Sequence, residues 1–233
     1  MSNSIFRSSS LVRLKLTMFV LFSVGMAVAL NANATRVNED LPRAEKWNKF
    51  ADDLYTLHQQ RIKGRDVYTE EENGGYGGLR GDLEYYREVR YYDRKSGRLL
   101  SNIKRENKNP DNIHIIELYI YDEQGRIKRE YTAAFLPTHR KAPYQTLINI
   151  HQYVDDLHGY RQFDASDDRL FESCAGKYFD EPVRILFDEA EIPDSSSQIL
   201  DEGERQAYLA CFEGLPKTAH PYINPLKEIS MAH

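Results

Sequence analysis

Apolar and polar residues alternate in two different ways along the chain, and the first of these patterns is helical. Over residues 41–63 the apolar side chains recur at three- and four-residue steps, which places them on one face of an α-helix. Pro42 suits the first turn of this helix, and Gly64 supplies a stop after it. We therefore predict an amphipathic helix over 41–63 that packs on a sheet. Its apolar stripe contains Trp47, Phe50, Ala51, Leu54 and Leu57.

The second pattern, over residues 83–188, is a series of short runs rich in Tyr, Ile, Val and Phe, residues that suit a pleated, half-buried strand. Each gap between the runs holds Gly, Pro, Asn or Asp, which tolerate turn dihedrals. Because the connections are short, the runs predict an antiparallel meander and not a parallel sheet with helical crossovers. The predicted strands are 85–92, 98–105, 113–121, 127–136, 145–154, 157–163, 170–175 and 183–187.

Two of the turns share a motif. Residues 92–98 and 121–126 both begin with Tyr-Asp and end with Gly-Arg. They look similar to the turns of tyrosine-aspartate hairpin repeats in bacterial exported proteins. That resemblance implies successive hairpins and no particular activity, and we assign the chain to no family from its sequence.

The segments on either side of these runs lack strand periodicity. The glycine-rich stretch 64–81 is predicted to be a loop, without the ending of a phosphate-binding P-loop. Residues 189–233 are predicted to form a loop, a short helix over 202–212 capped by Asp201, and a proline-rich tail that lies over the surface. The fold class is therefore α+β, mainly β. An N-terminal helix packs on a twisted antiparallel meander that can curl into a half-barrel, and a short disulfide-tethered helix covers one end.

Residues 1–34 have the layout of a cleaved secretory signal. Three basic residues and no acidic one accompany an apolar run over 16–30, and Ala32 and Ala34 fit the small-residue pattern before a cleavage site. The alternative is an uncleaved anchor, but a spanning helix needs about 20 apolar residues, more than this run offers. We expect 35–233 to be a single exported domain, periplasmic or secreted, with no stable membrane anchor.

Cys174 and Cys211 are the only cysteines of the chain. Because an exported protein meets an oxidising compartment, we predict a disulfide between them. The alternative is a pair of free buried thiols. The two cysteines are too far apart in the sequence for a Cys-x-x-Cys redox motif, which excludes a thioredoxin-like role.

The net charge of the chain and its distribution along the sequence indicate which classes of partner molecule are compatible with the protein. The net charge of −5 becomes −8 once the three basic residues of 1–34 are removed, which argues against a nucleic-acid partner. Residues 87–161 carry a net +4 and residues 162–233 a net −9. Either the basic segment contacts anionic envelope material, or the acidic segment pairs with it internally, and we favour internal pairing. The densest basic group comprises Arg126, Lys128, Arg129, Arg140 and Lys141.

No catalytic, cofactor-binding or metal-binding motif occurs in the chain, so we predict no cofactor and no metal. The best candidate site is a hairpin around the turn at Asp155 and Asp156. Pairing across this turn places Tyr153 near His158, and since alternate strand residues point the same way, six polar or aromatic side chains line one face. They are Asn149, His151, Tyr153, His158, Tyr160 and Gln162. A helix over the same residues would instead align His151, Asp155 and His158 as metal ligands.

We therefore expect a non-enzymatic exported binding or interaction module of a bacterial cell envelope. The hairpin face suits a glycan, another small polar ligand or a loop of an envelope protein. The alternative, which the polar character of these side chains favours, is an ordinary solvent-facing surface of the sheet. One alternative is a hydrolase that acts on envelope glycans through carboxylates that the sequence does not identify. Another is a periplasmic lipid or lipoprotein carrier, since a helix on a curved antiparallel sheet resembles the layout of such carriers. The run 113–121 has apolar residues on both faces, which predicts a central strand covered on both sides and argues against an open carrier cavity.

Overall fold

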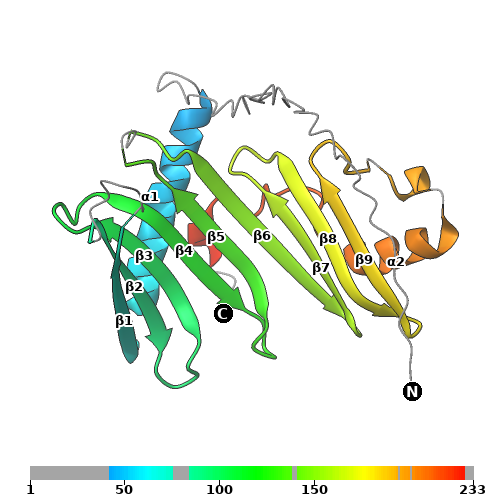
Figure 1. Cartoon of the computed structure of the whole chain (residues 1–233), viewed down its shortest axis with the longest axis horizontal. Helices are drawn as coiled ribbons and strands as arrows, with labels where there is room; N and C mark the ends of the chain where they lie inside the picture. Colours follow the sequence, from blue (N-terminus) through cyan, green and yellow to red (C-terminus); the bar gives the residue numbers. More distant parts are fainter. Residues whose placement is uncertain (1–41, 76–83, 138–140, 194, 200, 229–233) are drawn as a thin grey trace, which may run out of the picture. The chain divides into compact units, whose positions relative to one another are not determined.

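The structure is a computed structural model that describes residues 42–75, 84–137, 141–193, 195–199 and 201–228, all within one compact unit, Thr35–His233. The predicted signal over 1–34 lies outside the described residues. Nine antiparallel strands follow one another across a single sheet in the order of the chain (Figure 1). The predicted meander is confirmed, and the sheet is open, with β1 and β9 as its two edges. The strands are β1 (Val67–Gly74), β2 (Tyr86–Asp93), β3 (Leu99–Glu106), β4 (Ile113–Tyr121), β5 (Ile127–Ala134), β6 (Gln145–Val154), β7 (Leu157–Phe163), β8 (Arg169–Tyr178) and β9 (Glu181–Asp188).

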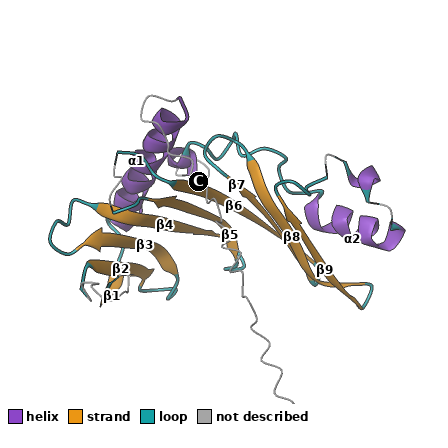
Figure 2. Cartoon of the chain, turned by 45° about the horizontal axis from the view of Figure 1, so that its top comes forward, coloured by secondary structure: helices purple, strands orange, loops and turns teal. Residues whose placement is uncertain are grey.

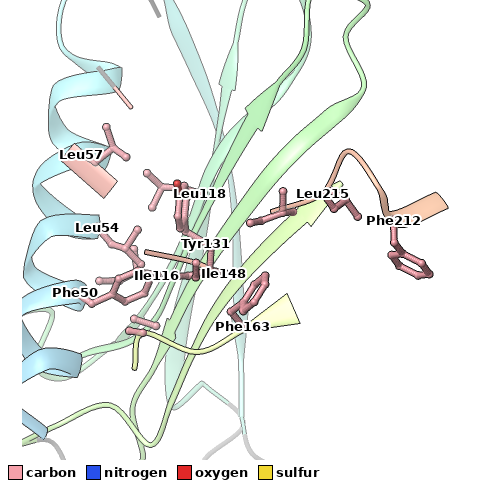
Figure 3. Close-up of a cluster of buried hydrophobic side chains, with 14 of the residues drawn as sticks. Phe50, Leu54, Leu57, Ile116, Leu118, Tyr131, Ile148, Phe163, Phe212 and Leu215 are labelled. Carbon is pink, nitrogen blue, oxygen red and sulfur yellow. The ribbon is translucent and has the colours of Figure 1, made fainter. Parts of the chain in front are cut away.

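The predicted N-terminal helix is confirmed as α1 (Pro42–Ile62). Its apolar stripe packs against β3 to β6, and Phe50 contacts Tyr131 with ring centroids 6.2 Å apart. Burying such a stripe stabilises the fold because apolar area is removed from water, at roughly 25 cal/mol per Å². Figure 3 draws the central side chains of this core, among them Phe50, Leu54, Leu57, Ile116, Leu118, Tyr131 and Ile148.

Successive side chains of a strand point to opposite faces of the sheet. Residues that lie opposite each other on neighbouring strands share a face, so the register assigns each side chain from β2 to β9 to one of the two faces. We call the side that packs against the helices the helix-covered face and the opposite side the open face. The helix-covered face includes Ile103, Ile116, Leu118, Tyr131, Ile148, Arg161, Cys174 and Ile185. The open face includes Glu88, Asn102, Glu117, Glu130, Asn149, His151, Gln162, Phe171 and Leu186.

The second helix, α2 (Glu202–Phe212), packs against β6 to β9 on the helix-covered face (Figure 2). The predicted cap is confirmed, since the Asp201 carboxylate accepts a hydrogen bond from the Glu204 N–H at 2.8 Å. The predicted disulfide is also present and joins Cys211 of α2 to Cys174 of β8, whose Cα atoms are 6.0 Å apart. Opposite Cys174 lies Gly159, where a Cβ atom would meet the Cys211 carbonyl oxygen at 2.3 Å. The helix backbone therefore approaches β7 at a point that only glycine permits.

Several buried polar side chains on the helix-covered face form hydrogen bonds with one another. Arg161 donates to Glu172 at 2.5 Å beneath α2, and the Tyr208 hydroxyl lies 3.0 Å from the same carboxylate. Under α1, His58 Nδ1 lies 2.8 Å from the Ser101 hydroxyl. Burial, with the charges of two nearby arginines, lowers the pKa of His58 to about 4, so this histidine is neutral in the folded protein at neutral pH.

Two predictions about the ends of the domain are wrong. The segment 64–81, predicted to be a loop, contains the edge strand β1. This strand was not predicted because Glu70, Glu71 and Glu72 interrupt any alternation of apolar and polar residues. The C-terminal tail does not simply lie over the surface. Its short 3-10 helix η2 (Pro225–Lys227) contacts α1, and Glu228 is buried.

Glu228 forms a bidentate ion pair with Arg129, with both N–O distances 2.5 Å, and accepts a hydrogen bond from the Tyr131 hydroxyl at 2.6 Å. This contact joins the acidic C-terminal segment to the basic sheet, as internal pairing requires. Within the predicted basic group, Arg129 is buried, Lys128 and Lys141 are exposed, and Arg140 lies outside the described residues.

The prediction that β4 is covered on both sides is wrong for the part of the chain that the structure describes. Both helices lie on the helix-covered face, and no described helix packs on the open face. The odd-numbered side chains of β4, among them Glu117 and Tyr119, are only half-buried there, by their neighbours on the sheet. A site that no described helix covers can therefore lie on the open face.

Candidate functional site

The structure confirms the predicted hairpin and brings its six candidate residues together on the open face. Asn149, His151 and Tyr153 of β6 lie directly opposite Gln162, Tyr160 and His158 of β7. The turn between the strands has Asp155 at a φ of 50°, a left-handed conformation that aspartate tolerates better than most residues. The helix that would have aligned His151, Asp155 and His158 does not form. No three or more His, Cys, Asp or Glu residues in the described ranges are grouped so as to hold a metal.

A carboxylate on the neighbouring strand completes this group. Glu130 of β5 lies opposite Asn149, and its Oε2 is 3.1 Å from His151 Nε2. On the other side of the ring, His151 Nδ1 is 2.9 Å from His158 Nε2. The Asn149 amide also donates to Glu130 at 3.2 Å. We call Glu130 and the six hairpin residues the polar-aromatic cluster.

The hydrogen bonds define one proton position in this group of side chains. The hydrogen bond from His151, opposed by burial, lowers the pKa of Glu130, so the carboxylate is ionised and accepts from His151 Nε2–H. His151 Nδ1 and His158 Nε2 share one hydrogen, and the tautomer decides which ring donates it. Burial and the neighbouring His151 lower the pKa of His158, which keeps that ring neutral at neutral pH. His158 Nδ1 has no hydrogen-bond partner among the described residues.

The amide and phenol groups of β7 leave two further positions open. Gln162 donates one N–H to Asn149 Oδ1 at 3.1 Å and the other to the Tyr160 hydroxyl at 2.6 Å. Its own Oε1 has no donor among the residues that the structure describes. Burial and the charge of Glu130 raise the pKa of Tyr160 to about 12, so the phenol keeps its hydrogen. Because the phenol accepts from Gln162, that hydrogen remains to be donated.

Aromatic rings and one guanidinium group pack around the cluster. The Tyr153 ring stacks on His158 with centroids 4.6 Å apart, and Arg126 lies 4.4 Å above the Tyr153 ring. Tyr160 contacts Phe171 of β8, with ring centroids 6.0 Å apart. The positions of Arg126, Glu130 and Phe171 beside the hairpin residues were not predicted. The alternation of side chains does not specify the register between β5 and β6. The loop that joins these strands is too long for its sequence to determine which residues lie opposite each other.

A second polar network lies on the open face at β2 to β4. The Asn102 side-chain nitrogen donates to Glu88 at 3.1 Å and to Glu117 at 3.0 Å. Glu88 also pairs with Arg90 and Lys104, and although burial opposes them, these two cations lower its pKa. The pKa is lowered for each of five carboxyl groups, those of Glu88, Asp93, Asp122, Glu130 and Glu202. That direction suits ion pairing and not the raised pKa of a glycosidase general acid.

Two surface depressions are lined by residues outside the polar-aromatic cluster. One, of about 670 Å³, lies between the end of β9 and the start of α2 and is lined by residues that include Phe187, Ile192 and Glu204. The other, of about 190 Å³, lies beside α1 and is lined by residues that include Tyr55 and Phe135. The second is smaller than the roughly 300 Å³ at which ligand pockets begin.

No helix in the described ranges combines the length and the apolar character that crossing a bilayer requires. In comparisons with known proteins, the chain matches no family model, no curated protein and no solved structure.

Proposed function

We propose that the protein is an exported, non-enzymatic binding module, and that the polar-aromatic cluster holds a hydroxyl-rich ligand such as an envelope glycan. One observation carries the proposal. Three polar groups without a described partner follow one another along β7, namely His158 Nδ1, the Tyr160 hydroxyl hydrogen and Gln162 Oε1. Alternate residues of a strand are about 6.6 Å apart, so the three groups form a row that neighbouring sugar hydroxyls can match.

Export is part of the same proposal. The Cys174–Cys211 disulfide supports it, because such bonds persist in oxidising compartments. The layout of residues 1–34 supports it as well. An exported protein at the bacterial envelope meets glycans that bear many hydroxyl groups, and a loop of an envelope protein would be the other occupant of this face.

The two alternatives have less support. A glycan hydrolase needs a carboxylic acid held protonated, and the pKa values of Glu88 and Glu130 on the open face are lowered instead. A lipid carrier needs an apolar cavity, whereas Phe50, Leu54 and Leu57 of α1 are packed directly against the sheet.

Isothermal titration calorimetry with soluble disaccharide-peptide fragments of peptidoglycan tests the proposal. Tyr160→Phe removes the hydroxyl that donates to the ligand and that also accepts from Gln162, and should weaken binding by about three- to tenfold, the effect of one hydrogen bond. Gln162→Ala should weaken it further. Tyr92→Phe is the matched control, since Tyr92 is a tyrosine at the other end of the same face, on β2.

Two results would count against the proposal. Equal affinity of the wild type, Tyr160→Phe and Tyr92→Phe variants would place the ligand elsewhere on the molecule. Mass spectrometry of the incubated fragments gives the second readout, and cleavage products that accumulate with time would identify a hydrolase instead of a binding module.

A further inference from the structure

The outer edge of β9 is a second surface with its own chemistry. Among the described strands, β9 pairs with β8 alone, through a two-residue turn at Phe179 and Asp180, whose φ values are 49° and 66°. In such a hairpin the residues that flank the turn exchange hydrogen bonds, and hydrogen-bonded pairs then alternate along the strands. It follows that every second residue of β9, starting at Pro182, turns its backbone groups away from β8. These residues are Pro182, Arg184, Leu186 and Asp188.

The backbone contacts agree with this alternation. The Asp188 carbonyl points outward, where it accepts hydrogen bonds from Glu191 and Ile192 at 2.8 and 3.1 Å. No described backbone group pairs with the outward N–H and C=O groups of Arg184 and Leu186. These four groups can form hydrogen bonds with the backbone of another strand. They are already in the extended conformation that such pairing requires.

The side chains of this edge are unlike those of the opposite edge. Leu186 is 49% exposed on β9, with Arg184 and Asp188 exposed on either side of it. At the other edge, β1 carries Glu70, Glu71 and Glu72, and three adjacent carboxylates on each strand would repel a second copy of themselves. Only the β9 edge therefore combines an exposed apolar residue with charges of both signs.

We propose that β9 pairs with β9 of a second copy of this chain, antiparallel, with Leu186 opposite the partner's Leu186. A two-fold axis makes the same strand meet itself antiparallel, so the pattern must be self-complementary. In this register Arg184 lies opposite the partner's Asp188, and the symmetry repeats the ion pair. A register centred on Arg184 would set two guanidinium groups against each other, and like charges directly opposite are unfavourable.

The dimer extends one sheet across two molecules and aligns their open faces. Because an edge pair buries less area than a standard interface, we expect reversible association that depends on protein concentration. The Asp188 carbonyl is already occupied, so pairing at that position uses its N–H and its carboxylate. This inference is independent of the ligand proposed above, since it involves β9 and not the residues of the polar-aromatic cluster.

Sedimentation velocity on the purified protein over a concentration series tests the inference. The expected result is a shift toward twice the mass of one chain as the concentration rises. Leu186→Lys should abolish that shift, because it places two cations opposite each other. Glu70→Lys on β1 is the matched control at the other edge and should leave the shift unchanged.

Charge reversal tests the register. Arg184→Asp alone and Asp188→Arg alone should each weaken association at least about tenfold, because each sets like charges across the interface twice. The double variant Arg184→Asp/Asp188→Arg should restore it. Within one strand the two residues are four positions apart and make no contact that such an exchange could repair.

Three results would overturn the inference. A wild-type protein that stays monomeric throughout the series has no such interface. A dimer that persists in Leu186→Lys uses another surface. A dimer that is lost in both single reversals and not regained in the double variant does not pair Arg184 with the partner's Asp188. Circular dichroism of each variant confirms that it is folded.

Discussion

The close approach of Cys211 to Gly159 leads to a prediction about two glycine-to-alanine substitutions. The substitution should lower the free energy of unfolding at Gly159 and raise it at Gly203. A Cβ atom on Gly159 would lie 2.3 Å from the Cys211 carbonyl oxygen and 3.1 Å from its carbonyl carbon. Non-bonded heavy atoms are comfortable at about 3.5 Å or more, so α2 would have to withdraw by about 1 Å. The disulfide to Cys174, directly opposite Gly159, resists that movement.

Overpacking of this kind costs up to about 3 kcal/mol. Replacing a glycine also recovers about 0.5–1 kcal/mol by restricting the unfolded chain. We therefore expect Gly159→Ala to lower the free energy of unfolding by about 2 kcal/mol. In Gly203→Ala, the new Cβ meets only the flexible Asp201 carboxylate, at 3.3 Å in the first turn of α2. There the helix propensity of alanine should raise stability by about 0.5 kcal/mol.

Urea unfolding, followed through Trp47 fluorescence and circular dichroism, measures both values. In a background without the disulfide the helix is freer to withdraw, so Gly159→Ala should cost less there, and a double-mutant cycle gives the difference. If Gly159→Ala is as stable as the wild type while Gly203→Ala behaves as expected, then α2 does not approach β7 as closely as described here.

Three further predictions concern other parts of the fold. Replacing Cys174 and Cys211 by alanine should lower stability by about 4 kcal/mol, because the bridge closes a span of 37 residues, and a urea midpoint that does not move would contradict this. His58 has a pKa of about 4 in the folded protein against 6.5 unfolded, so the unfolded chain binds the extra proton, and stability should fall by about 3 kcal/mol as the pH drops from about 6.5 to about 4. The His58→Gln variant should lack that part of the pH dependence in urea titrations at both pH values. Phe179→Asn/Asp180→Gly places residues that favour positive φ in the β8–β9 turn and should stabilise by about 1 kcal/mol, whereas a lower melting temperature would show that Phe179 makes a stabilising contact.

The elements with strong local patterns were predictable from the sequence. The α1 stripe and strands such as β4, β6 and β7 have the 3.6- or two-residue periods that burial imposes, and their bounds match closely. β1 was missed because an edge strand needs no apolar side chain. Its run of glutamates is stabilised as a strand by pairing with β2.

The candidate site was only half predictable, for a related reason. A short turn fixes the register of β6 and β7, so their facing residues follow from the sequence alone. Glu130 enters the site through a longer connection whose alignment local chemistry does not specify. The contact of Glu228 with Arg129 joins residues 99 positions apart and is set by the packing of the whole domain.

The meander has a consequence for how the protein is made. Its strands pair only with their neighbours in the chain, so hairpins can form one after another as the polypeptide emerges, with little loop entropy to overcome. The first and the last described elements do not follow this local pattern. α1 and η2 lie at opposite ends of the described chain, yet they contact each other. Until η2 has been synthesised, this contact with α1 cannot form, and Arg129 lacks Glu228 as its partner. A chain truncated before Glu228 would therefore leave a buried guanidinium group unpaired at the centre of the sheet.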